Sequence, residues 1–261
     1  MMDSASIVDL CKTIFPSTNI KAIAVCGPHA CGCASKNDPL EVLVVAEGFP
    51  AGVRFKKLKT GSLNVAFLAV SRALFELDVS RALLGETVTV RVLMPYEPLS
   101  GFEYLREMEV KFKRRRVLEA LTDLAVEYPE TTTELMIHPK YFPLRDVKLL
   151  STTYPPLKGV FSRILKSDRG LEAMVSGYVE ALKEAESKGL VEFVGEAVRP
   201  TKKLVSRASA KLRSPSFVRL FDRAFKTLVV RGFTGQVSLM DLAAEIMKGF
   251  THLSFTDQNA I

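Results

Sequence analysis

Two short apolar runs near the N-terminus constrain the fold of this chain more than any other feature. Residues 20–25 read Ile-Lys-Ala-Ile-Ala-Val, and residues 40–45 read Leu-Glu-Val-Leu-Val-Val. Both runs are apolar and too short for a typical buried helix, so each predicts a buried strand. A loop of small residues, 26–37, separates them, and residues 63–70 predict a third strand.

Helical patterns surround these strands. Apolar residues recur at helical spacing over residues 7–14, and Ser71 is placed to cap a helix that reaches about residue 84. Residues 103–127 predict one or two further helices, whereas residues 87–94 fit a strand or a helix equally. The first part of the chain is therefore predicted to be α+β, with an α/β-like mixed sheet and flanking helices.

The length allows a second domain. The chain has 261 residues, of which 48% are hydrophobic, enough for one large domain or two ordinary ones. Consecutive prolines at 155 and 156 resist both helix and central strand, so we predict domains at residues 1–150 and 154–261. No apolar run approaches the roughly 18–20 residues that span a bilayer, and no secretory signal is visible. We expect a cytoplasmic protein without a membrane partner.

The pattern beyond residue 156 is mostly helical. A short helix is predicted over residues 160–166 and a longer one from about residue 169, which Gly189 would end. Residues 190–194 and 197–200 then predict a β-hairpin. Helix, helix and hairpin in this order are typical of a winged helix-turn-helix, a module used for nucleic-acid binding, docking or dimerisation. Two more helical patterns cover residues 217–229 and 239–247.

The net charge of +7 is unevenly distributed. Residues 1–150 hold 19 basic and 18 acidic side chains, so the remainder carries almost all of the excess. Residues 199–231 hold ten basic side chains against one acid, a field that attracts polyanions. The alternative is a solvated helix face. The cations predicted to bind DNA or RNA are Arg199, Lys202, Lys203, Arg207, Lys211 and Arg213. A second basic run, 111–116, precedes apolar helical spacing and predicts a helix.

Three cysteines and a histidine are clustered in the loop after the first strand. They are Cys26, His29, Cys31 and Cys33. These side chains are soft metal ligands, so zinc or an iron–sulfur centre is one interpretation. Their spacing matches no paired Cys-x-x-Cys arrangement, which favours reduced cysteines in a small-residue loop.

The same loop carries a resemblance to a known family. The first strand ends in Val25-Cys26-Gly27-Pro28, and Asn37-Asp38-Pro39 precedes the second. This arrangement resembles the signature of the polymerase-β-type nucleotidyltransferases, particularly the minimal archaeal and bacterial kind. The resemblance covers roughly residues 5–150, and the addition of a winged helix resembles certain archaeal proteins. In that family a Gly-Ser pair ends the first strand, an Asp-x-Asp pair opens the second, and the next strand supplies a third carboxylate.

The resemblance implies a function for several residues of the loop. Paired carboxylates on one strand face would bind the Mg²⁺ ions that bridge a nucleoside triphosphate. Asp38 takes the position of the first acid. The nucleotide-binding positions are Gly27, Pro28 and Ser35.

The chain departs from the family pattern at three places. Pro28 replaces the serine, and Leu40 stands where the second acid is expected. Glu41 lies three positions from Asp38, which puts it on the opposite face of a regular strand. Asn64 occupies the third carboxylate position. The metal site is therefore predicted to be degenerate, unless Pro39 bends the strand so that Glu41 and Asp38 converge. Asp78, Glu86 and Glu97 lie near helix ends or loops and are expected at the surface.

Three functional hypotheses follow. The leading one is a pseudoenzyme, a nucleotidyltransferase-like domain with a degenerate site, joined to a winged helix that binds nucleic acid. The second is an active Mg²⁺-dependent nucleotidyltransferase acting on a protein or RNA acceptor through Asp38 and Glu41, with no other cofactor implied. The third is a protein–protein interaction module, which includes a homodimer.

Overall fold

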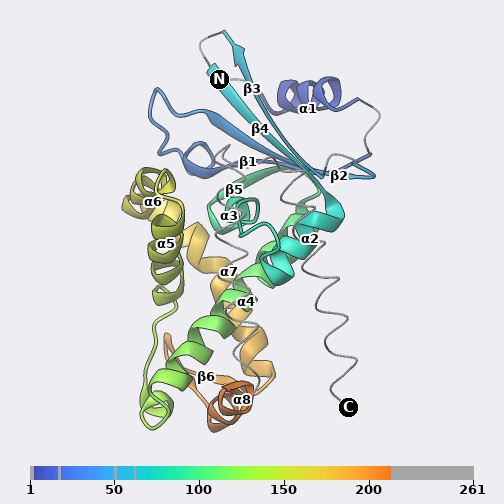
Figure 1. Ribbon diagram of the computed structural model, residues 1–261. Coiled ribbons are helices and arrows are strands. Elements are labelled where there is room, and N and C mark those ends of the chain that lie inside the picture. The colour runs from blue at the N-terminus through green and yellow to red at the C-terminus, as the bar shows by residue number, and fades with distance from the viewer. Residues whose placement is uncertain (1–2, 17–18, 50–51, 62, 213–261) are drawn as a thin grey trace, which may run out of the picture.

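The computed structural model describes residues 3–16, 19–49, 52–61 and 63–212. Its centre is a five-stranded sheet with the strand order β3-β4-β2-β1-β5 (Figure 1). The strands are β1 (Asn19–Cys26), β2 (Leu40–Glu47), β3 (Val53–Thr60), β4 (Leu63–Ser71) and β5 (Tyr96–Ser100). Strands β2 and β4 are parallel, and the other neighbouring pairs are antiparallel. The prediction of an α+β fold with a mixed sheet and flanking helices is confirmed.

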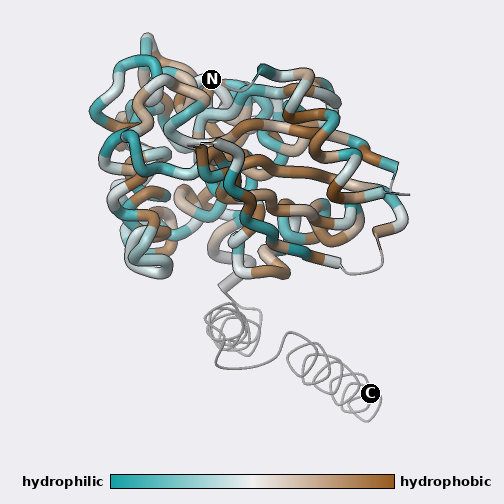
Figure 2. The backbone as a smooth tube through the Cα atoms, turned by 90° about the horizontal axis from the view of Figure 1, so that it is seen from above, coloured by the Kyte–Doolittle hydropathy of each residue, from teal (hydrophilic) through white to brown (hydrophobic). Residues whose placement is uncertain are grey.

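The two faces of the sheet are buried against different helices. In β2, Leu40 and Val42 belong to a cluster with Ile7 of α1 (Ser4–Ile14). Leu43 and Val45 belong to a second cluster, which is built with the helices that follow β4. Alternate residues of a strand face opposite ways, and both directions are apolar here. This double burial explains why the central strands read as nearly continuous hydrophobic runs, seen as brown segments in Figure 2.

The two edge strands, β3 and β5, were not predicted from the sequence. Strand β3 is largely exposed and rich in cations, so its sequence lacks the apolar alternation that indicates a half-buried strand. Strand β5 contains Pro98, which has no backbone N–H and is tolerated mainly at sheet edges. Both strands form because β4 and β1 offer them partners, information that a local pattern does not contain.

The helices beside the sheet follow their local signals. Ser71 caps α2 (Arg72–Arg81) by accepting a hydrogen bond from the Leu74 N–H at 3.4 Å. The helix ends before the predicted residue 84 because Ala82 adopts a left-handed conformation with φ 54°. The ambiguous segment contains the short helix α3 (Val90–Leu93), and the predicted long segment is the single helix α4 (Phe102–Glu127). No helix in the described ranges is both long and apolar enough to cross a membrane.

Much of the rest of the described chain packs against α4. The elements are α5 (Tyr141–Thr153), α6 (Leu157–Lys166), α7 (Asp168–Ser187), β6 (Val191–Val194), β7 (Ala197–Pro200) and α8 (Lys202–Leu212). The predicted short helix, long helix and hairpin are confirmed, whereas α5 was not predicted. Lys211 lies in α8, but its side chain is outside the described set. Arg213 and the helices predicted at 217–229 and 239–247 also lie outside the described residues.

One buried cluster passes through both halves of the chain. It joins Leu43 of the sheet to Leu121 of α4, Phe142 of α5, Tyr178 of α7 and Leu204 of α8. In Figure 1 the long helix α4 extends from the sheet to the hairpin end of the molecule. The two prolines at 155 and 156 form the turn between α5 and α6, and these helices also contact each other. A domain boundary at this turn stays a prediction.

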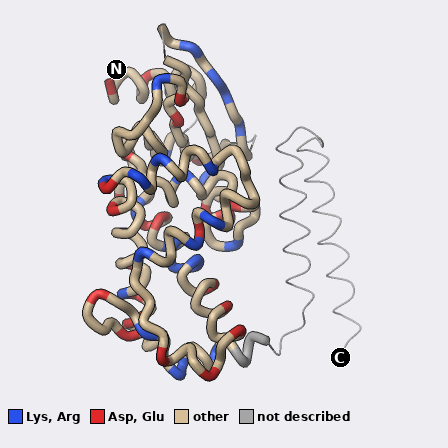
Figure 3. The backbone as a smooth tube through the Cα atoms, turned by 90° about the vertical axis from the view of Figure 1, so that its left-hand side faces the viewer, with Lys and Arg blue, Asp and Glu red and all other residues tan. Residues whose placement is uncertain are grey.

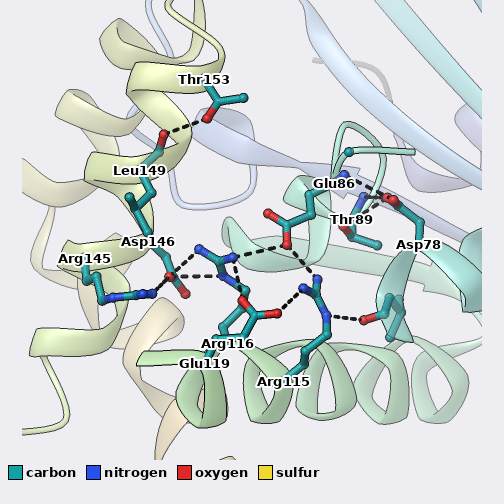
Figure 4. A network of polar contacts seen from close by, with 12 residues as sticks. Asp78, Glu86, Thr89, Arg115, Arg116, Glu119, Arg145, Asp146, Leu149 and Thr153 are labelled. Atoms are coloured by element: carbon teal, nitrogen blue, oxygen red, sulfur yellow. Dashed lines mark hydrogen bonds and ion pairs between the residues drawn. The ribbon is translucent and has the colours of Figure 1, made fainter. Parts of the chain in front are cut away.

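Helix α4 carries much of its basic run into the interior. Lys113 is buried and donates to Glu109 Oε1 at 2.6 Å and to the Met174 carbonyl of α7 at 2.8 Å. Arg116 is buried as well and donates to Asp146 Oδ1 of α5 at 2.7 Å (Figure 4). Their neighbours Arg114 and Arg115 pair with Glu184 and Glu86. These cations connect helices, which leaves little of their charge for a surface polyanion.

Two of the acids expected at the surface are buried. Asp78 has no exposed surface, and Glu86 is 4% exposed. Asp78 accepts hydrogen bonds from the turn that follows its helix, and Glu86 pairs with Arg115 and Arg116 (Figure 4). The arginine partners of Glu86 lie about thirty positions away in the chain, so its position beside a helix end was misleading. Glu97 is exposed, as expected.

Gly177 allows α7 to approach the buried Lys113–Glu109 pair. A Cβ atom at this position would lie 2.3 Å from Glu109 Oε1 and 2.9 Å from Lys113 Nζ. We expect Gly177→Ala to destabilise the protein by about 1–3 kcal/mol through overpacking, although alanine is otherwise the better helix former. Gly159→Ala in α6 is the matched control, because the nearest atom lies 3.9 Å away. Thermal denaturation measures both variants. If Gly177→Ala raised the melting temperature as much as Gly159→Ala, the result would contradict this close packing.

Candidate functional site

The loop after β1 is folded tightly on its own backbone. Gly27 has φ 75°, a conformation that L side chains rarely adopt, and its N–H donates to the Pro95 carbonyl at 2.8 Å. The Pro28 carbonyl accepts from the Cys33 N–H at 2.9 Å. Ser35 donates its N–H to Asp38 Oδ2 at 2.7 Å. Of the predicted nucleotide-binding positions, Gly27 and Ser35 thus already use their N–H groups, and Pro28 has none to offer a phosphate.

Asp38 is held at the end of this loop by an arginine from the second half of the chain. Arg163 of α6 donates to Asp38 Oδ1 at 2.7 Å, while Oδ2 accepts the Ser35 N–H. His29 Nε2 lies 3.1 Å from the Asp38 carbonyl. Partial burial alone would raise the pKa of Asp38, but the Ser35 hydrogen bond and the Arg163 charge lower it below its usual value. Asp38 is therefore an ionised carboxylate with both oxygens engaged.

Glu41 lies on the other face of the sheet. It is on β2 and follows the alternation of Leu43 and Val45, so it points toward α3. Its Oε2 atom lies 3.3 Å from Nε of Arg91, an ion pair whose geometry falls outside that of a hydrogen bond. Glu41 and Arg91 are both mostly buried, with 24% and 18% of their side chains exposed.

The arrangement does not fit a two-metal site. Mg²⁺ requires carboxylate oxygens that converge on one point, and metal pairs lie roughly 3.5–4 Å apart. Asp38 lies in the loop and lines the groove beside α1, whereas Glu41 lies on β2 and is directed toward α3, and each is already paired with an arginine. Within the described ranges, no group of three or more acidic, histidine or cysteine side chains is placed to hold a metal. Asn64, at the third position, is exposed on β4.

A groove of about 1100 Å³ lies beside Asp38 on the face of the sheet that carries α1. Its floor is apolar and includes Val25, Leu40 and Leu99. The charged side chains that line it are Asp3, Asp38, Glu97 and Lys36. Carboxylates outnumber the lysine, which makes this groove electrostatically unfavourable for a polyphosphate that arrives without metal ions.

The cysteine cluster is held mainly by sulfur and backbone contacts. All four cysteines of the chain are free, and the Cys31 and Cys33 sulfurs lie 3.2 Å apart. Burial raises the pKa of Cys26 to about 12, and burial with the Cys31 contact raises the pKa of Cys33 to about 11. These two thiols are therefore protonated at neutral pH, so binding a metal here would require the release of their protons.

The basic segment around β7 and α8 combines paired and unpaired cations. Arg199 of β7 pairs across the hairpin with Glu192 of β6. Lys203 donates to the Lys188 carbonyl at 2.8 Å. Lys202 and Arg207 are exposed on α8, and no ion pair in the described part of the chain involves either of them.

The site contains two residues that sequence reasoning missed, Arg91 and Arg163. Each pairs with an acid that the hypothesis of an active nucleotidyltransferase had assigned to Mg²⁺. Arg163 is 125 positions from Asp38, so no local spacing could have revealed the contact. The sequence contains no local signal for this contact, because the contact depends on how α6 packs against the loop.

Comparisons with known proteins are sparse. No family model matches the chain, and no curated protein matches it. Among solved structures, the chain is similar to the crystal structure of a nucleotidyltransferase-like protein from Exiguobacterium sibiricum 255-15, with 12% sequence identity and a TM-score of 0.33. The alignment covers 96% of this chain and 73% of that one.

Proposed function

We propose that this chain is a nucleotidyltransferase-like protein that does not transfer nucleotides and binds nucleic acid through the basic surface of β7 and α8. The observation that carries the proposal is the pair of exposed cations Lys202 and Arg207, which have no acidic partner in the described residues. Exposed cations without acidic partners are the groups that phosphate oxygens attract.

The arginine contacts of the loop support the absence of transfer chemistry. Arg163 supplies to Asp38 the positive charge that a metal ion would supply in an active site, and Arg91 does the same for Glu41. Asp38 is held by α6 and Glu41 by α3, each through its own arginine, which favours a structural role for both acids over a shared ligand. We therefore describe the protein as a pseudoenzyme, in which the loop is retained and arginines take the place of the metal ions.

The order of elements supports a winged helix as the binding module. Helices α6 and α7 precede the hairpin of β6 and β7, and α8 follows it directly. In this arrangement a hairpin and an adjacent helix present cations to the phosphate backbone together. Arg199 on the hairpin, together with Lys202 and Arg207 on α8, would form that surface.

Binding titrations test this proposal. We expect the wild type to bind labelled duplex DNA or single-stranded RNA with an affinity that falls steeply with salt concentration. Lys202→Gln with Arg207→Gln should lower affinity and reduce the slope of log K against log salt by about 1.8 for duplex DNA, the loss of two phosphate contacts. Lys148→Gln with Lys158→Gln, two exposed lysines on α5 and α6, is the matched control.

Two results would contradict the proposal. One is an absence of binding to duplex, single-stranded or transfer RNA at low salt; a dimer seen by light scattering would then favour the interaction module. The other is nucleotide transfer to RNA or protein in the presence of Mg²⁺ and a nucleoside triphosphate that is abolished by Asp38→Asn.

A further inference from the structure

The most concentrated unneutralised charge of the described chain lies on β3, at the edge of the sheet. Arg54, Lys56, Lys57 and Lys59 fall within this strand, which contains no acid. No ion pair in the described ranges involves any of the four, in contrast to the cations of α4. Figure 3 shows blue repeated along this edge of the sheet. The charge pattern of the sequence predicted the basic surface elsewhere, because residues 53–60 lack the apolar alternation that indicates a half-buried strand.

An aromatic ring stands among these cations. Phe55 is 55% exposed, and Lys57 Nζ lies 5.5 Å from the centre of its ring. Phe55, Lys57 and Lys59 share one face of the strand, while Arg54 and Lys56 project to the other. An exposed aromatic flanked by unpaired cations is the combination that single-stranded nucleic acid binds, by stacking a base on the ring and placing phosphates beside the cations.

We propose that the β3 edge binds single-stranded nucleic acid, with Phe55 stacked on an unpaired base and Lys57 and Lys59, on the same face, beside the adjacent phosphates, while Arg54 and Lys56 add positive charge from the other face. The inference rests on the proposed function and specifies the type of nucleic acid that the protein takes. In Figure 1, β3 and α8 lie at opposite ends of the molecule, so this surface is separate from that of Lys202 and Arg207.

Other roles for this strand explain fewer of its features. Lysines on an edge strand discourage pairing between sheets, but that role requires no exposed ring beside them. An anionic membrane attracts cations as well, yet interfacial binding needs an apolar face, and Phe55 is the only large apolar side chain exposed on β3. A base in duplex DNA is already stacked on both of its faces, so it could not stack on the Phe55 ring.

Fluorescence anisotropy with a labelled single-stranded RNA of twelve uridine nucleotides tests the inference. We expect Phe55→Ala to lower affinity for this RNA roughly 5- to 150-fold, the effect of losing one stacked base. Phe102→Ala, which removes a phenylalanine that is 53% exposed on α4, should leave affinity unchanged. Lys57→Gln with Lys59→Gln should reduce the salt slope by about 1.4, whereas Lys148→Gln with Lys158→Gln should not.

The outcomes separate the two proposals. If the wild type binds no nucleic acid, both fall, and co-sedimentation with phosphatidylserine vesicles would then assign β3 to a membrane. If the wild type binds RNA and only Lys202→Gln with Arg207→Gln weakens it, the proposed function stands and the β3 inference is overturned. Circular dichroism and melting temperature of each variant confirm that it is folded.

Discussion

Replacing Glu109 by methionine is expected to lower the free energy of unfolding by about 3–5 kcal/mol, because it leaves Lys113 charged and buried without its partner. Lys113 is 1% exposed and Glu109 is 4% exposed. Without Glu109, Lys113 keeps the Met174 carbonyl as its hydrogen-bond acceptor. Glu109 also accepts from Arg106 at 2.7 Å and from Tyr96 at 2.9 Å, so its loss affects three donors at once. Urea denaturation at pH 7 measures the effect.

The matched variants separate the charge effect from a packing effect. Lys113→Met leaves Glu109 with two donors and should be less destabilising than Glu109→Met. The double variant should be more stable than the sum of the single losses predicts, because two apolar side chains replace an ion pair of similar volume. Additive losses within about 0.5 kcal/mol would contradict a coupled pair.

The pair also determines part of the acid sensitivity. Burial alone would raise the pKa of Glu109, but the charges of Lys113 and Arg106 lower it below 4.5. A carboxyl whose folded pKa is depressed contributes stability above its unfolded pKa, and that contribution is lost as pH falls through the folded pKa. Stability of the double variant should therefore fall less steeply than that of the wild type below pH 4.5.

Sequence patterns predicted those parts of the fold that local residues determine. Strands β1, β2 and β4 are buried on both faces, so their apolar runs were visible, and Ser71 marked the start of α2 by its own hydroxyl. Strand β3 was missed because its outer edge is exposed and its stability comes from pairing with β4. Because β3 is exposed, its sequence lacks the apolar pattern of a buried strand, and its cations are accessible to a ligand.

The candidate site was predictable in part. The loop and the position of Asp38 followed from the family resemblance, and the period of a strand predicted that Glu41 would face away from it. The partners were not predictable, because Arg163 reaches Asp38 only when α6 packs on the loop, and Arg91 lies beyond two strands and a helix from Glu41. For the same reason the run of cations in α4 gave no indication of being buried.

Asp78 is expected to be nearly as important for stability as Glu109, although no cation among the described residues pairs with it. Its side chain has no exposed surface and accepts four hydrogen bonds from the turn that links α2 to α3 (Figure 4). Oδ1 accepts from the N–H groups of Leu84 at 2.7 Å and Glu86 at 3.1 Å. Oδ2 accepts from the N–H of Thr89 at 3.2 Å and from its hydroxyl at 3.1 Å.

Asp78→Ala should therefore destabilise the protein by about 3–5 kcal/mol, because two buried N–H groups and one partly buried N–H group lose their acceptor and each unsatisfied buried donor costs about 1–3 kcal/mol. Asp78→Asn retains one carbonyl oxygen, which can still accept from Leu84 and Glu86, so we expect a loss of about 1–3 kcal/mol. Thr89→Val removes only the hydroxyl donor and should have the smallest effect. Chemical denaturation of the three variants gives the order directly. Equal losses of stability for the alanine and asparagine variants would contradict this explanation, because they would show that the negative charge of Asp78, rather than its acceptor geometry, holds the turn. This turn places Glu86 beside Arg116 and leads to Arg91, which pairs with Glu41.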